Sequence, residues 1–301
     1  MAQRRVLGAL GATVAEAAAQ RLGLALPLAA RVLPAPELTE EVPPPPPGLV
    51  RAFVQHVGGD PAAYRSRLPP HLFPQWAVPL GARTLRGLPY PMLEVINGGC
   101  RLQLNAPLPA GAPLRLSARL EAIEDDGRRA VLRQRVVTGT SAVADALVAE
   151  LFVIVPSVRR SLPARRSAIG EAAAARKSPA RVPAHARELA FWRLPADAGL
   201  TFALLTGDIN PIHWMRPYAR AAGFRSPILH GFSTLARAIE GLVRTLFAGS
   251  VTRLASVDVR FTRPLALPAR VGLYLDGHDF FVGDAPMGPA YLTGSFTERP
   301  L

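Results

Sequence analysis

A run of apolar residues between Ile228 and Phe247 constrains the fold of this chain more than any other feature. Its apolar positions fall at steps of three and four: Leu229, Phe232, Leu235, Ala236, Ile239, Leu242, Val243 and Leu246. This spacing predicts a helix of about six turns with one continuous apolar stripe, while Arg237, Glu240 and Arg244 face away from it. Because such a stripe needs a large apolar partner, we expect a sheet that wraps the helix.

The segment just before this helix places an acid and a histidine, Asp208 and His213, in a short turn around Pro211. Proline lacks an N–H and biases the preceding residue toward an extended backbone, so this turn is a loop. A carboxylate and an imidazole on one loop can hold the same water molecule and act together in general acid–base catalysis. The sequence leaves open which of the two transfers the proton.

Strand and helix patterns continue on both sides of this loop. The first half predicts a short helix over 48–58 and strands over about 93–104, 114–123, 130–137 and 143–155, with a hairpin turn at Asp126 and Gly127. The second half predicts a strand over 188–193, a short helix over 199–206, and strands over 254–262, 271–276, 280–283 and 290–297. Antiparallel strands grouped around one helix predict an α+β fold.

The two halves also resemble each other in sequence. An alignment of the halves places Pro107 on Pro264, Leu108 on Leu265, Leu114 on Val271, Leu116 on Leu273, and Asp60 near Asp208. Duplication of one fold explains this similarity. We therefore expect a lead-in over residues 1–44 that includes an Ala-rich helix over 4–22, a first copy over 45–156, a linker over 157–186 and a second copy over 187–301. The first copy has neither the NPxH sequence nor a long central helix, so we interpret it as a partner surface without chemistry of its own.

Composition excludes several function classes. The formal charge is +13, but Lys177 is the only lysine, and no basic run is interleaved with aromatic residues, so we do not expect nucleic-acid binding. A basic balance suits an anionic partner, such as the phosphates of coenzyme A or an acidic carrier protein. No stretch reaches the roughly 18 apolar residues that span a membrane. The single cysteine, Cys100, excludes an internal disulfide and is interpreted as a buried structural thiol in a cytoplasmic protein.

The residues around the loop resemble a known family. The Asp-Ile-Asn-Pro-Ile-His sequence at 208–213 and the Pro-Ile-Leu-His-Gly sequence at 227–231 are similar to the signature of the MaoC-like, or type 2, (R)-specific enoyl-CoA hydratase and dehydratase family. The duplicated layout resembles the double-hotdog subgroup of that family. Trp214, Met215 and Phe232 depart from the usual residues at their positions, which bears on the acyl chain that is accepted.

This resemblance implies an α+β double hotdog, in which two antiparallel sheets each wrap a central helix and the N-terminal helix is short or degenerate. It implies a hydro-lyase that reversibly hydrates a trans-2-enoyl thioester to the (R)-3-hydroxyacyl thioester. By position, Asp208 and His213 are the expected catalytic pair, and the Gly231 N–H is expected to receive the thioester oxygen. A backbone N–H in the first turn of a helix has no partner within the helix and lies at the positive end of the helix dipole.

Three further residues are expected to support the site. Asn210 is interpreted as a brace of the loop and His230 as a structural residue at the start of the helix. Ser233 could bond to the loop or cap free N–H groups. His56, His71, His185 and His278 show no ligand spacing with one another, so we expect no metal and no cofactor other than the coenzyme A or carrier protein of the substrate.

Other functions remain open at this stage. The substrate could be a 3-hydroxyacyl group on acyl carrier protein, the protein could bind acyl thioesters without catalysis, or it could hydrolyse them. A homodimer of double hotdogs is possible. Because the first copy is expected to leave its sheet unfilled, the sequence predicts a medium or bulky acyl chain.

Overall fold

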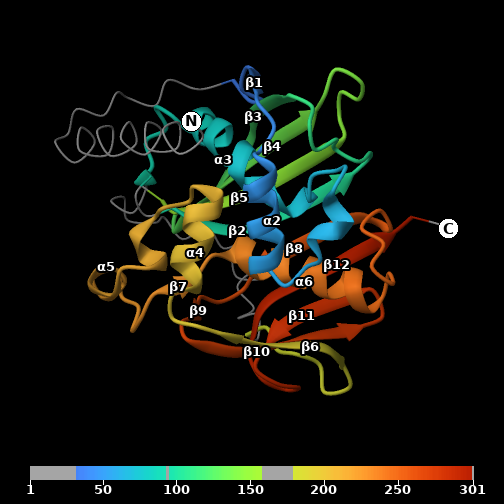
Figure 1. The fold of residues 1–301 in the computed structure, drawn as a ribbon. Coiled ribbons are helices and arrows are strands. Elements are labelled where there is room, and N and C mark those ends of the chain that lie inside the picture. The colour runs from blue at the N-terminus through green and yellow to red at the C-terminus, as the bar shows by residue number, and fades with distance from the viewer. Residues whose placement is uncertain (1–31, 93–94, 158–178, 300–301) are drawn as a thin grey trace.

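The computed structural model describes residues 32–92, 95–157 and 179–299 of the chain. Its main sheet is antiparallel and has ten strands in the order β1-β3-β4-β5-β2-β8-β12-β11-β10-β6 (Figure 1). The strands of the first half are β1 (Leu38–Val42), β2 (Ile96–Leu104), β3 (Leu114–Asp125), β4 (Arg129–Gly139) and β5 (Leu147–Pro156). Those of the second half are β6 (Arg187–Leu194), β8 (Leu254–Phe261), β10 (Ala269–Asp276), β11 (Asp279–Gly283) and β12 (Ala290–Glu298).

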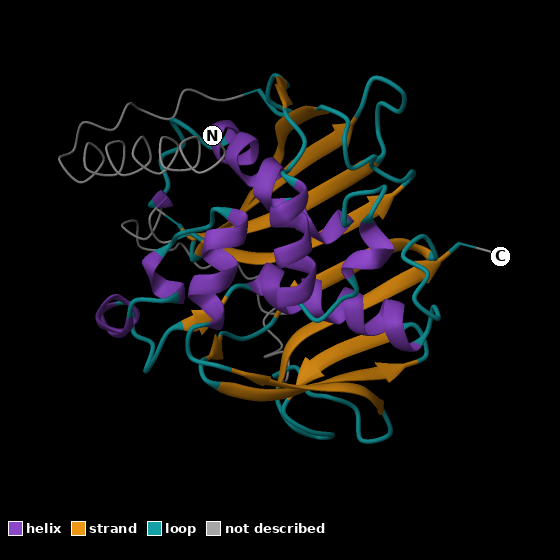
Figure 2. Ribbon diagram, viewed as in Figure 1, coloured by secondary structure: helices purple, strands orange, loops and turns teal. Residues whose placement is uncertain are grey.

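The helices lie together on one face of this sheet (Figure 2). They are α2 (Pro47–His56), α3 (Pro74–Thr84), α4 (Ala198–Thr206), α5 (Arg216–Ala221) and α6 (Gly231–Thr245), with 3-10 turns η1 (Pro61–Tyr64), η2 (Pro70–Leu72) and η6 (Pro211–His213). Every strand expected from alternation is present, and α2 and α4 match the two expected short helices. Among the described residues, no helix combines the length and apolarity needed to cross a membrane.

The two halves meet edge to edge between β2 and β8. Cys100 lies opposite Val259 in this pair, and both side chains are fully buried. Burial raises the pKa of the Cys100 thiol far above its usual range, so the group stays protonated, as expected of a structural thiol. The expected pair of sheets is therefore one continuous sheet, and each half of it carries its own helix.

The central helix of the second half, α6, is shorter than predicted. It begins at Gly231 and has 15 residues. Ile228 and Leu229 form a short strand, β7, that pairs with β9 (Leu265–Ala266). The apolar spacing of these two residues fits a helix, but pairing with β9 satisfies their backbone groups instead.

Arg237, Glu240 and Arg244 were predicted to form an exposed polar face of α6, and this prediction is wrong for the first two. Glu240 is only 3% exposed, and it accepts a hydrogen bond from the Tyr64 hydroxyl (2.7 Å). Its carboxylate also lies 3.1 Å from His71 Nε2. Arg237 is largely buried, and burial lowers the pKa of its guanidinium to about 10. Both side chains face the first half of the chain rather than water, and only Arg244 is exposed.

The first half also has a helix, α3, that was not among the helices predicted. Pro74 occupies the first turn of α3, where its missing N–H is not needed, and Pro79 lies inside the helix. Helix α3 covers β3 and β4. Its residue Leu80 and the preceding Phe73 are almost fully buried. The N-terminal helix is thus short but present. The empty space from which we predicted a medium or bulky acyl chain is filled, so that argument was wrong.

The boundaries at the ends of the first copy also differ from the prediction. Residues 38–42, assigned to the lead-in, form β1 and pair with β3. At the end of the predicted linker, Val182 is fully buried and its N–H donates to the Gly288 carbonyl (3.0 Å), so this part belongs to the second half. The predicted helix over 4–22 and linker residues 158–178 lie outside the described residues.

Candidate active site

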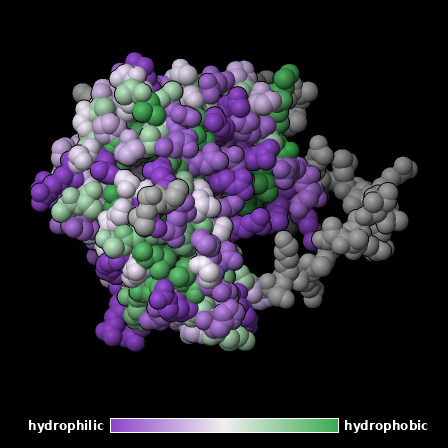
Figure 3. Space-filling model, turned by 90° about the vertical axis from the view of Figure 1, so that its right-hand side faces the viewer, coloured by the Kyte–Doolittle hydropathy of each residue, from purple (hydrophilic) through white to green (hydrophobic). Residues whose placement is uncertain are grey.

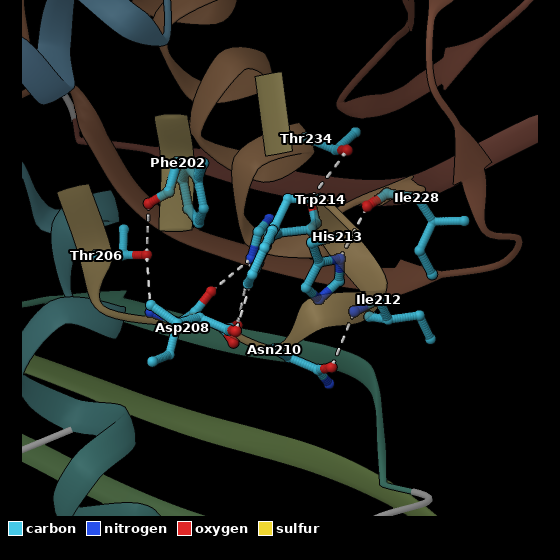
Figure 4. A network of polar contacts seen from close by, with 11 residues as sticks. Phe202, Thr206, Asp208, Asn210, Ile212, His213, Trp214, Ile228 and Thr234 are labelled. Atoms are coloured by element: carbon cyan, nitrogen blue, oxygen red, sulfur yellow. Dashed lines mark hydrogen bonds and ion pairs between the residues drawn. The ribbon is translucent and has the colours of Figure 1, made fainter. Parts of the chain in front are cut away.

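The candidate site begins where α4 ends. Gly207 has a left-handed backbone (φ 83°) and its N–H bonds to the Ala203 carbonyl (2.8 Å), which stops the helix sharply. The Thr206 hydroxyl donates to the Phe202 carbonyl (2.8 Å) and accepts from the Asp208 N–H (3.4 Å) (Figure 4). These contacts fix the point at which the loop leaves the helix, and they fix the position of Asp208.

The loop itself is braced by its own side chains. Asn210 Oδ1 accepts from the Ile212 N–H (3.2 Å), as predicted for a loop brace. The indole N–H of Trp214 donates to the Ile209 carbonyl (3.2 Å) (Figure 4). These two hydrogen bonds therefore fix the loop backbone on both sides of Pro211.

His213 is oriented by the short strand β7. Its Nδ1 lies 2.8 Å from the Ile228 carbonyl oxygen, which can only accept, so Nδ1 carries the proton in this contact. In the neutral ring, Nε2 is then a hydrogen-bond acceptor. Burial lowers the pKa of His213, and the Asp208 carboxylate and the Ile228 bond partly offset that effect. The neutral form with a free Nε2 lone pair is the dominant state at neutral pH.

His230 forms the third side of the site. Its ring stacks on that of His213, with centroids 3.5 Å apart and planes at 26°. Its Nε2 donates to the Asp208 backbone oxygen (2.9 Å) and lies 3.9 Å from the Asp208 carboxylate. Burial lowers the pKa of His230 to about 4. The residue predicted to be structural thus touches both expected catalytic residues and stays neutral beside them.

Asp208 is the most accessible member of this group, with 37% of its side chain exposed. Ligand atoms of Asp208, His213 and His230 lie within 4.8 Å of one another, close enough to share a water molecule or an ion. One nitrogen of each ring already donates to a backbone carbonyl. The second nitrogen of each neutral ring is therefore an acceptor, able to take a hydrogen bond from a water molecule or to ligate a cation.

Gly231 is the first residue of α6, so its N–H has no helical partner. A Cβ at this position would lie 2.7 Å from the Phe261 ring. Only a glycine leaves room for the Phe261 ring at this position. Phe261 belongs to an aromatic wall in which the Phe232 ring makes edge contacts with Phe73 and with Phe261, at centroid distances of 5.1 Å and 5.8 Å. Phe73 comes from the first half, so both halves build this wall.

Ser233 has neither of its two predicted roles. Its side chain is fully buried and its Oγ has no hydrogen-bond partner among the described residues. Sequence reasoning also missed Gly199, where a Cβ would lie 2.0 Å from the His213 carbonyl oxygen. A glycine inside a helix was the only signal for this contact, because Gly199 and His213 come together only in the folded chain.

Comparison with known proteins bears on the site directly. The model of the MaoC like domain matches residues 172–279, which include the loop and all of α6. This match covers most of the second half of the chain. The 3-hydroxyacyl-thioester dehydratase Y of Mycobacterium tuberculosis is 34% identical over 181 residues, which cover 57% of this chain and 58% of that protein. Enoyl-CoA hydratase ChsH3 of the same organism is 30% identical over 175 residues, and these cover 58% of each.

The similarity to these relatives therefore spans a little over half of their length. Among solved structures, HtdX of Mycobacterium tuberculosis matches with a TM-score of 0.67 at 19% identity, over 88% of this chain and 100% of that one. At that identity the match concerns the fold. With five strands and one central helix in each half, joined through β2 and β8, the chain is a double hotdog.

Proposed function

We propose that the chain catalyses the reversible addition of water across the C2=C3 bond of a trans-2-enoyl thioester, which yields a 3-hydroxyacyl thioester. The observation that carries this proposal is the bond from His213 Nδ1 to the Ile228 carbonyl, which leaves Nε2 as an acceptor beside the Asp208 carboxylate. A water that donates one O–H to each of these acceptors directs its oxygen lone pair toward C3. The names of the two relatives support the same reaction class.

The reaction then follows from these positions. Asp208 acts as the main base and takes one proton of the water, while His213 holds the other, and the oxygen bonds to C3. The electrons of the double bond move onto the thioester oxygen, where the Gly231 N–H at the positive end of α6 stabilises them. A proton delivered to C2 from the protonated pair completes the addition, and dehydration runs through the same steps in reverse.

His230 has a supporting role in this scheme. If His213 gains a proton, the resulting cation lies against a ring that stays neutral, because the pKa of His230 is held at about 4. A second cation at that position would repel it. The bond from His230 to the Asp208 backbone also keeps the carboxylate beside His213.

The test is turnover of crotonyl-CoA, followed by loss of the enoyl absorbance. Asp208→Asn and His213→Ala should each lower kcat by about 100-fold to 10,000-fold, the usual contribution of a positioned acid or base. Asp197→Asn is the matched control, since this exposed carboxylate precedes α4 and makes no side-chain capping bond. Retained turnover in both site variants would refute the proposal, and acyl-CoA binding without any hydration would favour a silent binding protein.

The carrier of the acyl group is the finer part of this proposal. Arg216 and Arg220 are exposed on α5, which follows the catalytic loop directly, and Arg225 is exposed just beyond it. These arginines suit the phosphates of coenzyme A as well as the acidic surface of a carrier protein. Rates on crotonyl-CoA and on the same acyl group attached to a carrier protein distinguish the two, because a carrier-protein enzyme gains from the protein part.

A further inference from the structure

A continuous row of ring contacts joins the interior of the first half to the candidate active site. We call this row the ring column, and its members in order are Tyr64, His71, Phe53, Phe202, His230 and His213. Successive ring centroids lie 6.0, 5.5, 6.0, 4.9 and 3.5 Å apart. Rings whose centroids are separated by up to about 7 Å are in contact. The first five rings are at most 4% exposed, so the column belongs to the packed interior.

Phe202 is the ring at which the column passes from one half to the other. It lies on α4 of the second half, whereas Phe53 lies on α2 of the first half, and these two helices contact each other. The Phe202 side chain is fully buried, and its ring contacts both Phe53 and His230. The packing of the first half is therefore connected to His230 through this side chain.

Phe202 is also connected to both expected catalytic residues. Its ring contacts His230, whose own ring stacks on that of His213. Its backbone carbonyl accepts a hydrogen bond from the Thr206 hydroxyl (2.8 Å), and that hydroxyl accepts one from the Asp208 N–H (3.4 Å) (Figure 4). A shift of Phe202 would therefore displace the supports of Asp208 and His213 together.

We propose that Phe202 is a positioning residue for the hydration reaction and that the first half, through Phe53, holds it in place. This inference rests on the proposed function. Protein interiors are close-packed, so a smaller side chain at position 202 leaves a void into which its neighbours relax only partly. His230 would then lose the packing that keeps its ring against His213. Displacement of a reacting group by about 1 Å can cost about 100-fold in rate.

Steady-state turnover of crotonyl-CoA by the full chain tests the proposal. Phe202→Leu should lower kcat by about 100-fold, and Phe53→Leu, whose ring is one contact further from His230, by about tenfold. KM should stay within about threefold of its original value in both variants, because both rings are fully buried and do not contact a substrate. Unchanged kcat in Phe202→Leu would overturn the proposal.

Phe280→Leu is the matched control. Phe280 is as deeply buried as Phe202, and its ring contacts Phe296 (6.3 Å), which in turn contacts Phe247 (5.8 Å) just beyond the end of α6. Helix α6 begins at the candidate site, and its 15 residues span about 22 Å. It runs toward the right-hand side of Figure 1, the side that faces the viewer in Figure 3.

The control separates positioning from stability. Phe280→Leu should lower the urea midpoint about as much as Phe202→Leu does, because both remove the same atoms from a fully buried position. It should nevertheless retain full kcat. Equal losses of kcat in the two variants would show a general effect of packing, and the proposal would then be wrong.

A second readout does not depend on turnover. Burial holds the pKa of His230 at about 4, and the Asp208 carboxylate opposes this effect. Phe202→Ala should open His230 to water and raise that pKa toward 6.5, whereas Phe280→Ala should leave it near 4. Titration of the histidine ring resonances by NMR measures both values. A His230 pKa that stays near 4 in Phe202→Ala would contradict the proposal, whereas absence of turnover in the unmodified chain would refute the hydration reaction and leave this readout intact.

Discussion

Gly199 provides a sharp test of how the fold positions the loop from Asp208 to His213. It is the second residue of α4, and a Cβ added there would lie 2.0 Å from the His213 carbonyl oxygen. Real Cβ contacts essentially never fall below 3.0 Å, so in Gly199→Ala the loop backbone must retreat by at least 1.0 Å, the difference between the two distances. His213 would move with it, which changes its distances to Ile228 and Asp208. A misplacement of about 1 Å can cost about 100-fold in rate.

The effect on stability should be smaller than the effect on rate. Overpacking typically costs about 1–3 kcal/mol, while alanine is favoured over glycine inside a helix by about 1 kcal/mol. We therefore expect kcat on crotonyl-CoA to fall about 100-fold while the free energy of unfolding in urea changes by less than about 2 kcal/mol.

The first half offers a matched control for this substitution. Gly48 is the second residue of α2, the counterpart of α4, and a Cβ there meets nothing within 4 Å. Gly48→Ala should retain full activity. Full activity of Gly199→Ala would show that the contact does not position His213, and an equal loss in both variants would show that the effect is not local.

Two further predictions concern buried polar groups. Since the pKa of His230 is about 4 in the folded chain and near 6.5 when unfolded, the unfolded chain binds the extra proton; stability should therefore fall as pH drops from 6.5 toward 4, by at most about 3 kcal/mol. Urea unfolding across this range should show a weaker pH dependence in His230→Gln, and an unchanged slope would contradict the assignment. Tyr64→Phe removes the hydroxyl that donates to the buried Glu240 carboxylate and should lower the free energy of unfolding by about 1.5–3 kcal/mol. An unchanged urea midpoint would mean that this hydrogen bond contributes nothing measurable.

Local pattern was enough to predict the strands and the loop from Asp208 to His213. Alternation at Leu114, Leu116, Ala118 and Leu120 predicts β3 because a strand places successive side chains on opposite faces, and all four are buried. Pro211 ends any helix through the loop, whatever surrounds it. Asn210 braces its own backbone, a contact that spans two residues and is therefore readable from the sequence.

Contacts between distant residues were not predictable in this way. Periodicity assigned Ile228 to the helix, but its pairing with Ala266 comes from a strand nearly forty residues away in sequence. Glu240 was placed in water because it falls off the apolar stripe, whereas Tyr64 and His71 of the first half cover it. Helix α3 was not predicted, and burial of its apolar face outweighs the cost of Pro79 inside it.

The sequence by itself determined that this chain has two related halves, that the second half carries the Asp208–His213 loop, and that a glycine lies in the first turn of the helix behind it. These features depend on neighbours in the chain or on a motif of fixed spacing. Only the tertiary structure decided which nitrogen of His213 is free, that His230 stacks against it, and that the first half contributes Phe73 to the aromatic wall. Such properties depend on atoms that meet across the interface between the halves, and no local spacing encodes those distances.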